Sequence, residues 1–276
     1  MDAVQTVHRK AWAADTFAEG QRAIAEETAV AFVYDGSSYA VMMATPRDLE
    51  DFAVGLSLTE GIVGDKNEIE AIEILEEPIG IELRMRLAVP RGRALTERKR
   101  YLAGPVGCGL CGIDSLAEAV RPVKAVTAGL VTTPEIVLGA LDAMGDGQAI
   151  NRKTRAVHAA AFATRVGEVV AVREDVGRHN ALDKLAGAMA RKGIDPREGF
   201  LLITSRLSVE LVQKAATMGV PMLVAVSAPT ALAVRTAEAA GMTLVAVARR
   251  DGFEVFTHPQ RIQAMAAAKA GSDGGR

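Results

Sequence analysis

The chain has 276 residues, 49% of them hydrophobic and 24% charged, and its formal net charge is −2. This length allows one large domain or two lobes with a buried core, and the near-neutral charge gives no whole-chain attraction to nucleic acid or membrane. No apolar run reaches the roughly 18 to 20 residues of a membrane span and the first residues hold no signal-peptide core, so we expect a cytoplasmic protein without a nucleic-acid or membrane partner.

The first segments of the chain favour β-structure. Residues 1–27 are polar and rich in alanine, with no clear period, and we expect no functional role for them. The runs 29–34 and 39–44 flank an Asp-Gly-Ser-Ser turn signal. Two β-rich runs around such a signal predict a hairpin.

A helix is expected after this hairpin, because Thr45 can cap it, Pro46 suits its first turn and Gly61 can end it. Residues 79–89 then alternate between apolar side chains and polar or small ones. A period of two indicates a half-buried strand. We therefore expect residues 22–107 to form the smaller, β-rich N-terminal lobe.

From residue 126 the pattern alternates between helix and strand. A helix is expected from Thr133 to about Met144, followed by a hairpin over 158–173 and a helix that ends at Gly193. Three short apolar runs of strand length follow, separated by helical stretches: 200–204, 222–226 and 243–248. Such a βαβαβ series predicts an α/β fold with a largely parallel sheet over residues 126–268. Ligands of such folds bind beyond the carboxyl ends of the strands.

The only two cysteines, Cys108 and Cys111, form a Cys-Gly-Leu-Cys loop inside a Gly-rich segment. In a reducing compartment this pair indicates a site rather than a structural disulfide. Asp114 can begin a helix just after the loop, and the positive end of a helix favours the reactive thiolate. We interpret 108–125 as a cysteine loop and connector. Two incidental buried thiols would have the same spacing and stay an alternative.

Metal binding and redox exchange would also use two cysteines at this spacing. Structural zinc needs four ligands, but the chain has no second Cys-x-x-Cys and only four scattered histidines. A zinc deaminase pairs His-x-Glu with Pro-Cys-x-x-Cys, whereas neither His158 nor His179 is followed by Glu in that pattern. We therefore predict no metal site. Thioredoxin-like exchange expects the motif after the first strand of a small βαβ unit, and here it lies mid-chain.

A second candidate site is the stretch from Arg173 to Lys184, which packs seven ionisable groups into twelve positions. It follows a predicted strand and enters a predicted helix, where an α/β fold places its ligands. His179 is a proton-transfer candidate, and Arg173 and Arg178 are potential anion partners. A solvated helix start would show the same pattern.

Three loops after strands complete the candidates. Loops 204–208 and 227–230 place hydroxyl groups at helix starts, where they can cap the helix or meet a phosphate. The segment 247–252 carries adjacent arginines that can clamp a pyrophosphate or be solvated. The basic run 91–100 precedes the cysteine loop and could guide an anion there.

An ordered set of segments within residues 22–262 is familiar: VMMATPRDLEDFAVGLSLTEGI, GCGLCGIDSLAEA, VHAAAF, REDVGRHNALDKL, SRLSVELVQKAATMGVPMLVAVSAPTALAV and FTHPQRI. Together they resemble the FdhD family of formate dehydrogenase accessory sulfurtransferases. The resemblance implies a sulfur carrier that takes persulfide sulfur from a cysteine desulfurase. It passes this sulfur to the molybdenum or tungsten bis-guanine-dinucleotide cofactor, which formate dehydrogenase then receives.

The resemblance also implies roles for residues. Cys108 is expected to bear the persulfide, with Cys111 as its helper. The resemblance and the loop positions described above together predict the cofactor contacts. These are His179, Arg206, Val247, Ala248, Arg249, Arg250, Asp251 and Gly252. No cofactor is expected to be permanently bound, since the molybdenum cofactor is the sulfur acceptor. The stretch 153–158 departs from the Gly-rich approach that family members often have there.

Two further expectations come from the resemblance. The C-terminal lobe should be a three-layer α/β/α, cytidine-deaminase-like fold without its zinc chemistry, and the protein should be a homodimer. The alternative function is a chaperone that delivers the mature cofactor to apo-formate dehydrogenase without carrying sulfur.

Overall fold

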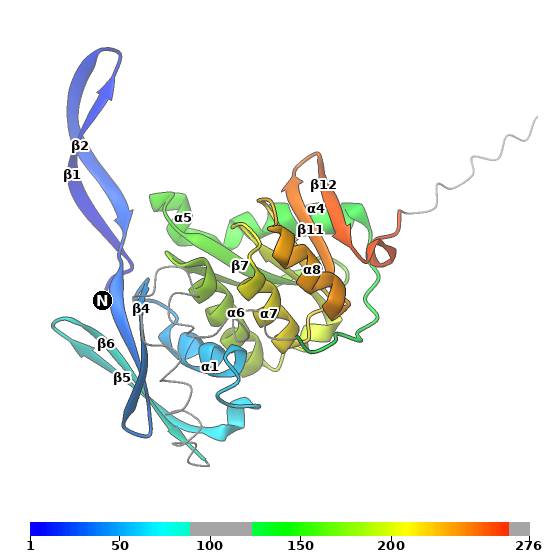
Figure 1. The fold of residues 1–276 in the computed structure, drawn as a ribbon. Helices are drawn as coiled ribbons and strands as arrows, with labels where there is room; N and C mark the ends of the chain where they lie inside the picture. Colours follow the sequence, from blue (N-terminus) through cyan, green and yellow to red (C-terminus); the bar gives the residue numbers. More distant parts are fainter. Residues whose placement is uncertain (89–122, 265–276) are drawn as a thin grey trace, which may run out of the picture.

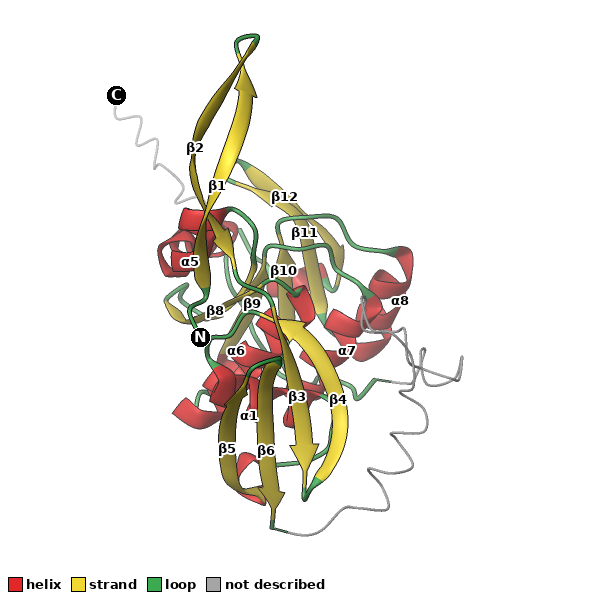
Figure 2. Ribbon diagram, turned by 90° about the vertical axis from the view of Figure 1, so that its left-hand side faces the viewer, coloured by secondary structure: helices red, strands yellow, loops and turns green. Residues whose placement is uncertain are grey.

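A computed structural model describes residues 1–88 and 123–264, which form a four-stranded sheet, a six-stranded sheet and a separate two-stranded arm (Figures 1 and 2). The fold class is α/β, as expected. The predicted boundaries at residue 107 and over 108–125 lie at least partly outside the described residues. Within the described residues, no helix is both long enough and apolar enough to span a membrane.

The N-terminal lobe is a mixed sheet in the order β4-β3-β6-β5. Its strands are β3 (Thr28–Tyr34), β4 (Ser37–Ala44), β5 (Ile69–Glu77) and β6 (Gly80–Leu87). The hairpin predicted at 29–44 and the strand predicted at 79–89 are confirmed by β3–β4 and β6, whereas β5 was not predicted. Helix α1 (Leu49–Thr59) covers the sheet through the Phe32–Phe52 ring contact, with 4.9 Å between centroids.

The predicted start of α1 is wrong by about three residues. Helix α1 begins at Leu49, after Asp48 in a left-handed conformation with φ 53°. Thr45 does not cap it, because its side chain and backbone are used across the lobe boundary. Its N–H donates to Asp175 at 3.0 Å and its hydroxyl accepts from the Val176 N–H at 3.1 Å.

Residues 1–27, which show no clear period in the sequence, form regular structure. Strands β1 (Val4–Ala13) and β2 (Thr16–Ala25) pair along their whole length and form the arm. The turn residues Ala14 and Asp15 both have positive φ, 46° and 58°, as a two-residue hairpin turn of type I′ requires. None of the arm's side chains is buried, so no face needed the apolar period that reveals a strand.

The C-terminal lobe is built on a six-stranded sheet in the order β12-β11-β10-β9-β7-β8. Its strands are β7 (His158–Thr164), β8 (Val169–Asp175), β9 (Gly199–Ile203), β10 (Met222–Ala225), β11 (Thr243–Arg249) and β12 (Gly252–Thr257). Only β9, β10 and β11 run parallel. The hairpin predicted at 158–173 is confirmed by β7 and β8, and the predicted βαβαβ series is confirmed by β9, β10 and β11. Strand β12 was not predicted and pairs antiparallel with β11, so the sheet as a whole is mixed rather than largely parallel. Strands β7 and β8 form one hairpin, β11 and β12 form another, and β7 also pairs antiparallel with β9.

Helices lie on both faces of this sheet, which gives three layers. One core packs the sheet against α6 (Arg178–Lys192), α7 (Val209–Met218) and α8 (Ala231–Ala240), and the opposite core packs it against α4 (Pro134–Ala143). Helix α5 (Ala149–Thr154) lies near the arm. Four short 3-10 helices complete the described elements: Lys66–Glu68, Met144–Gly147, Pro196–Glu198 and Pro259–Arg261.

The two lobes meet where α1 crosses α6 at very close range. A Cβ on Gly55 would lie 1.7 Å from the carbonyl oxygen of Asp183, and one on Gly187 would lie 1.9 Å from that of Asp51. Only glycine allows the two backbones to approach this closely. The crossing holds the N-terminal lobe against the helix that carries the charged stretch identified in the sequence.

Candidate functional site

The candidate site lies at one edge of the six-stranded sheet. The parallel strands β9, β10 and β11 all end at this edge, and β7 begins there because it runs antiparallel to β9. The Ala159 N–H donates to the Thr204 hydroxyl, on the residue after β9, at 2.9 Å. His158, at the start of β7, is therefore placed beside the loop that follows β9.

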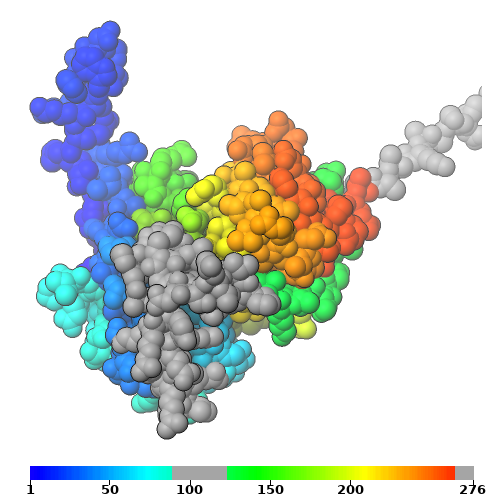
Figure 3. Space-filling model, in the orientation of Figure 1, coloured from blue at the N-terminus to red at the C-terminus, as the bar shows by residue number. Residues whose placement is uncertain are grey.

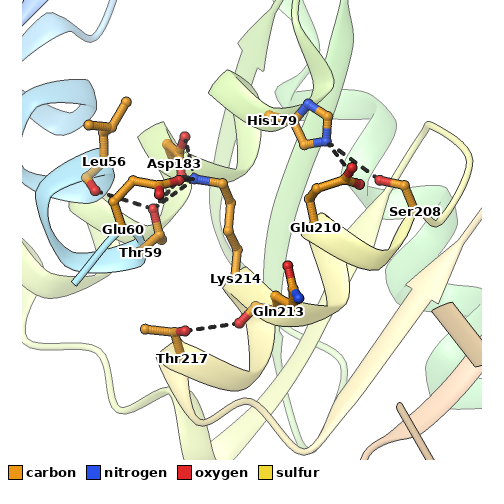
Figure 4. Close-up of polar contacts among 10 residues, drawn as sticks. All are labelled: Leu56, Thr59, Glu60, His179, Asp183, Ser208, Glu210, Gln213, Lys214 and Thr217. Atoms are coloured by element: carbon orange, nitrogen blue, oxygen red, sulfur yellow. Dashed lines mark hydrogen bonds and ion pairs between the residues drawn. The ribbon is translucent and has the colours of Figure 1, made fainter. Parts of the chain in front are cut away.

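Two helix starts meet at this edge. Neither the N-cap of α6, Gly177, nor that of α7, Ser208, caps its helix through its side chain. His179 in the first turn of α6 faces the start of α7, with its Nε2 3.5 Å from Ser208 Oγ and 3.9 Å from Glu210 Oε2 (Figure 4). The imidazole thus links the two helix starts.

The environment determines the charge of the groups at this edge. Burial alone would raise the pKa of Glu210, but His179, Ser208 and the backbone of α7 outweigh it and lower this pKa to about 2. Burial lowers the pKa of His158, and the positive charge of Arg178 lowers it further. Glu210 is therefore ionised and His158 is neutral near pH 7.

Arg178 brings a positive charge without a counter-ion in the part of the chain that the structure describes. Its Nε is buried and makes no hydrogen bond there. A buried donor without an acceptor is costly, so such an atom suggests a site for an anionic ligand. The adjacent backbone of α6 presents the positive end of a helix dipole in the same place.

The predicted arginines at the other loops are placed differently from one another. Arg206 is exposed in the loop after β9. Arg249 donates to the carbonyl oxygens of Ala248, at 2.9 Å, and Val226, so it lies against the end of β10 at the candidate edge. Arg250 instead approaches Asp142 of α4, at 3.4 Å, on the helix that covers the opposite face. The two adjacent arginines therefore have separate partners.

The segment that contains these arginines has a strained backbone near the end of β11. Val247 has φ 53°, a left-handed conformation that β-branched residues rarely adopt. The register between β11 and β12 shifts over this segment, between Ala246 and Arg249. Arg250 and Asp251 form the turn, and Gly252 begins β12. Strain of this kind is concentrated at functional sites, and here it falls in the predicted cofactor segment.

Most charges of the stretch from Arg173 to Lys184 join parts of the protein to one another. Arg173 pairs with Asp51 of α1 at 2.6 Å. Glu174 accepts from the first N–H groups of α5, at 2.8 and 2.7 Å. Asp175 pairs with the fully buried Lys184 at 2.6 Å, and Lys184 also donates to the Thr45 carbonyl. Of this stretch, Arg178 and His179 are left to serve the candidate site.

A second buried ion pair joins α6 and α7, one helical turn beyond His179 and Glu210 (Figure 4). Lys214 of α7 donates to Asp183 of α6 at 2.9 Å and to Glu60, after α1, at 2.6 Å. Thr59 donates to Asp183 at 2.6 Å. Burial opposes the charge on Lys214, but Asp183 and Glu60 outweigh it and raise the lysine pKa. The cluster ties the N-terminal lobe to the helices that form the candidate site.

Sequence reasoning missed Glu210, because an acidic residue in a first helical turn is common and only the fold brings it to His179. The predicted persulfide carrier Cys108 and its helper Cys111 lie outside the described residues, as does the basic run 91–100. Among residues 1–88 and 123–264, no group of three or more His, Cys, Asp or Glu side chains is arranged to hold a metal ion.

Comparison with known proteins identifies the family. The chain is 53% identical over 258 residues to the sulfur carrier protein FdhD of Agrobacterium fabrum, an alignment that covers 93% of this chain and 95% of that protein. It is 47% identical over 240 residues to the protein of the same name from Bordetella petrii, covering 87% of this chain and 86% of that protein.

A solved structure agrees with this fold. The crystal structure of a protein from Desulfotalea psychrophila, described as a putative formate dehydrogenase accessory protein, superposes with a TM-score of 0.76 at 23% identity. The superposition covers 95% of this chain and 100% of that chain. The family model described as FdhD/NarQ matches residues 25–263, and the chain therefore belongs to the FdhD/NarQ family.

Proposed function

We propose that this protein is a cytoplasmic sulfurtransferase that carries sulfur to the molybdenum or tungsten bis-guanine-dinucleotide cofactor of formate dehydrogenase. The observation that carries the proposal is the relationship to proteins named sulfur carrier protein FdhD. Their sequences are 53% and 47% identical to this chain over 93% and 87% of its length. The cationic edge of the C-terminal sheet supports it, because the proposed acceptor is a polyanion.

The first step loads sulfur onto the chain. The Cys108 thiolate attacks the outer sulfur of the persulfide on a cysteine desulfurase. An S–S bond forms to Cys108, the S–S bond on the desulfurase breaks, and the desulfurase cysteine leaves as a thiolate. No oxidant or reductant is consumed. Cys111 assists Cys108 in this step, a role that the family resemblance implies.

The second partner is the dinucleotide cofactor, which is the acceptor rather than a resident group. Its pyrophosphates would be bound by Arg178 and the start of α6, with Arg249 and Arg206 on neighbouring loops. His179 positions the start of α7 through Ser208 and Glu210. The unpartnered Nε of Arg178 is the described atom that best fits this role.

Mass spectrometry of the sulfur-loading step tests this function. After incubation with a cysteine desulfurase and cysteine, the peptide with Cys108 should gain one sulfur atom that a thiol reductant removes. The Cys108→Ala variant should gain none at this position. Failure of the wild-type chain to gain sulfur on either cysteine contradicts the proposal.

The second candidate function is a cofactor chaperone that carries no sulfur. The cationic edge is compatible with it, because arginine side chains can bind the pyrophosphates of the cofactor without carrying sulfur. A strain that lacks the native gene separates the two functions. Sulfur carriage predicts that Cys108→Ala does not restore formate dehydrogenase activity, whereas a chaperone predicts that it does. Dithiol redox exchange predicts that Cys111→Ala fails as severely as Cys108→Ala.

A further inference from the structure

His158 is a titratable side chain at the candidate edge that the proposed function does not use. It is half-buried at the start of β7, where it is in register with Asp175 at the end of β8. Helix α6 begins shortly after Asp175, so the imidazole lies beside the turn that places Arg178 and His179. Burial and the charge of Arg178 lower the pKa of His158, which is therefore neutral near pH 7.

The Thr204 hydroxyl contacts this ring and suits both of its protonation states. Its oxygen accepts from the Ala159 N–H at 2.9 Å and lies 3.5 Å from His158 Nδ1 and from the Ala159 carbonyl oxygen. When the imidazole is neutral, the hydroxyl can donate to Nδ1. When it is protonated, Nδ1 donates to the hydroxyl, which then donates to the Ala159 carbonyl. A proton can therefore enter the ring without the loss of a hydrogen bond.

The charges that face the ring come from β8 and α6. Asp175 of β8 favours the protonated imidazole, but its carboxylate already accepts from the buried Lys184 at 2.6 Å. Arg178 of α6 opposes protonation, and its Nε has no hydrogen-bond partner among the described residues. Like charges at close range repel each other, so a second cation beside Arg178 is unfavourable until an anion binds there.

The other titratable groups at this edge have different surroundings. His179 of α6 also opposes protonation of His158, but its own ring faces Glu210 of α7, with 3.9 Å between Nε2 and Oε2. Arg206, in the loop after β9, is exposed. Of the two imidazoles at this edge, His158 is the one that the described residues leave without a free carboxylate.

We propose that His158 is a further ligand-binding residue of this edge and takes up a proton from solvent when a pyrophosphate diester binds beside Arg178. The bound anion offsets the repulsion by the arginine and attracts the protonated ring, which becomes an additional cation of the site. Binding then tightens as the pH falls, because a proton enters with the ligand. The inference rests on the anion site of the proposed function, and it does not depend on sulfur loading.

The sign of the pH dependence follows from two pKa values of His158. In the free protein this pKa lies below its ordinary value of 6.5, and a bound anion raises it. The gain in affinity is fully present below the free-state pKa and is lost as the pH rises through the bound-state pKa. A rise of about one in the pKa corresponds to about tenfold tighter binding, which we expect between about pH 8 and about pH 5.

Calorimetry of the full chain with GDP-mannose measures this coupling. GDP-mannose is a pyrophosphate diester whose charge stays constant over this range, whereas the terminal phosphate of GDP titrates near about pH 6. Titrations in two buffers with different ionisation enthalpies give the affinity and the number of protons taken up. Proton uptake should approach one per chain between the two pKa values and should vanish at about pH 8.

Histidine variants identify the group that takes up the proton, since the chain has four histidines. His158→Asn keeps an acceptor for the Thr204 hydroxyl but does not titrate. It should bind GDP-mannose like wild type at about pH 8 and lack the gain at low pH. His8 lies on the arm, which stands clear of the rest of the molecule (Figure 3), and His258 lies at the opposite edge of the sheet, beside the start of β11. The control His258→Asn should keep the wild-type pH dependence.

Nuclear magnetic resonance follows the same proton in the wild-type chain. The ring resonance of His158 is assigned by its absence from the spectrum of His158→Asn. It should titrate at a higher pH with saturating GDP-mannose than without it.

The proposal fails on any of three results. The first is an affinity for GDP-mannose that is the same at about pH 5 and about pH 8. The second is a pH dependence that His158→Asn retains as fully as His258→Asn, or a His158 titration that the ligand does not move; either would assign the proton to another group. The third is no binding at any pH, which would overturn the anion site as well. Sulfur loading of Cys108 is measured separately, so its failure is distinguishable from all three.

Discussion

Removal of the Lys214 ammonium group tests whether the ion-pair cluster joins the lobes. In Lys214→Met the side chain keeps similar length but donates to neither Asp183 nor Glu60, which lie 2.9 and 2.6 Å from Nζ. Asp183 is 1% exposed and retains only the Thr59 hydroxyl among the side-chain donors shown in Figure 4. Breaking a buried pair in this way costs about 3–5 kcal/mol. That is a large part of the roughly 5–15 kcal/mol that stabilises a typical protein.

Urea unfolding, followed by circular dichroism, measures this cost. With a slope of about 3 kcal/mol/M, the midpoint should fall by roughly 1–1.7 M. Asp183→Asn in addition to Lys214→Met should recover much of the loss, because no unpaired charge remains buried. The control Arg165→Ala breaks an exposed pair with Glu198 and should cost less than about 1 kcal/mol. A loss for Lys214→Met no larger than that control would refute the role given to the cluster.

Three further predictions concern the candidate edge and the lobe crossing. Calorimetry should show that Arg178→Ala weakens binding of GDP, used as a probe, about tenfold, whereas the surface variant Arg197→Ala does not; equal affinities would contradict the anion site. Glu210 titrates near pH 2 when folded and near 4.5 otherwise, so its stabilisation is present above about pH 4.5 and lost as the pH falls toward 2. The Glu210→Gln variant should therefore lose less stability than wild type across that interval in chemical denaturation, and an identical pH dependence would exclude this role. Gly55→Ala should cost about 3 kcal/mol or more because of the 1.7 Å contact, while Gly139→Ala in open space on α4 should be neutral or stabilising by up to about 1 kcal/mol; similar thermal midpoints would contradict the close crossing.

The elements that sequence reasoning predicted are those whose pattern is complete within a short segment. Strands β9, β10 and β11 are buried on both faces, so each appears as a continuous apolar run. Helix α4 begins with Thr133 as its cap and a proline in its first turn, which is a local signal. Local signals of this kind do not depend on the rest of the fold.

The elements that it missed lack such a pattern. The arm is exposed on both faces, and its turn uses Ala14 and Asp15 where an Asn-Gly or Asp-Gly pair would have been recognised. Strand β5 alternates only in part, because as an edge strand it carries carboxylates at several positions along its length. Strand β12 was also missed, and the sequence did not show that β7 lies antiparallel to β9, because the direction of a strand in a sheet depends on distant neighbours.

In the candidate site, too, sequence reasoning found the features that a short segment reveals and missed those that depend on the fold. The sequence indicated that the stretch from Arg173 to Lys184 was important, and it named His179 and Arg178. It could not show that Asp175 and Asp183 find their lysine partners within the fold, and that these pairs are structural. Nor could it place Glu210 beside His179, since the two lie on different helices. Long-range pairing decides which charges are left for a ligand.

Transfer of labelled sulfur distinguishes sulfur carriage from cofactor delivery in a single experiment. The chain is loaded with radioactive sulfur from a cysteine desulfurase, separated from the donor, and mixed with the guanine-dinucleotide molybdenum cofactor and apo-formate dehydrogenase. We expect the label to leave the chain and appear with the cofactor in active enzyme, and we expect Cys108→Ala to deliver none. Active enzyme without label, formed equally well with the Cys108→Ala variant, would contradict sulfur carriage and leave cofactor delivery as the function.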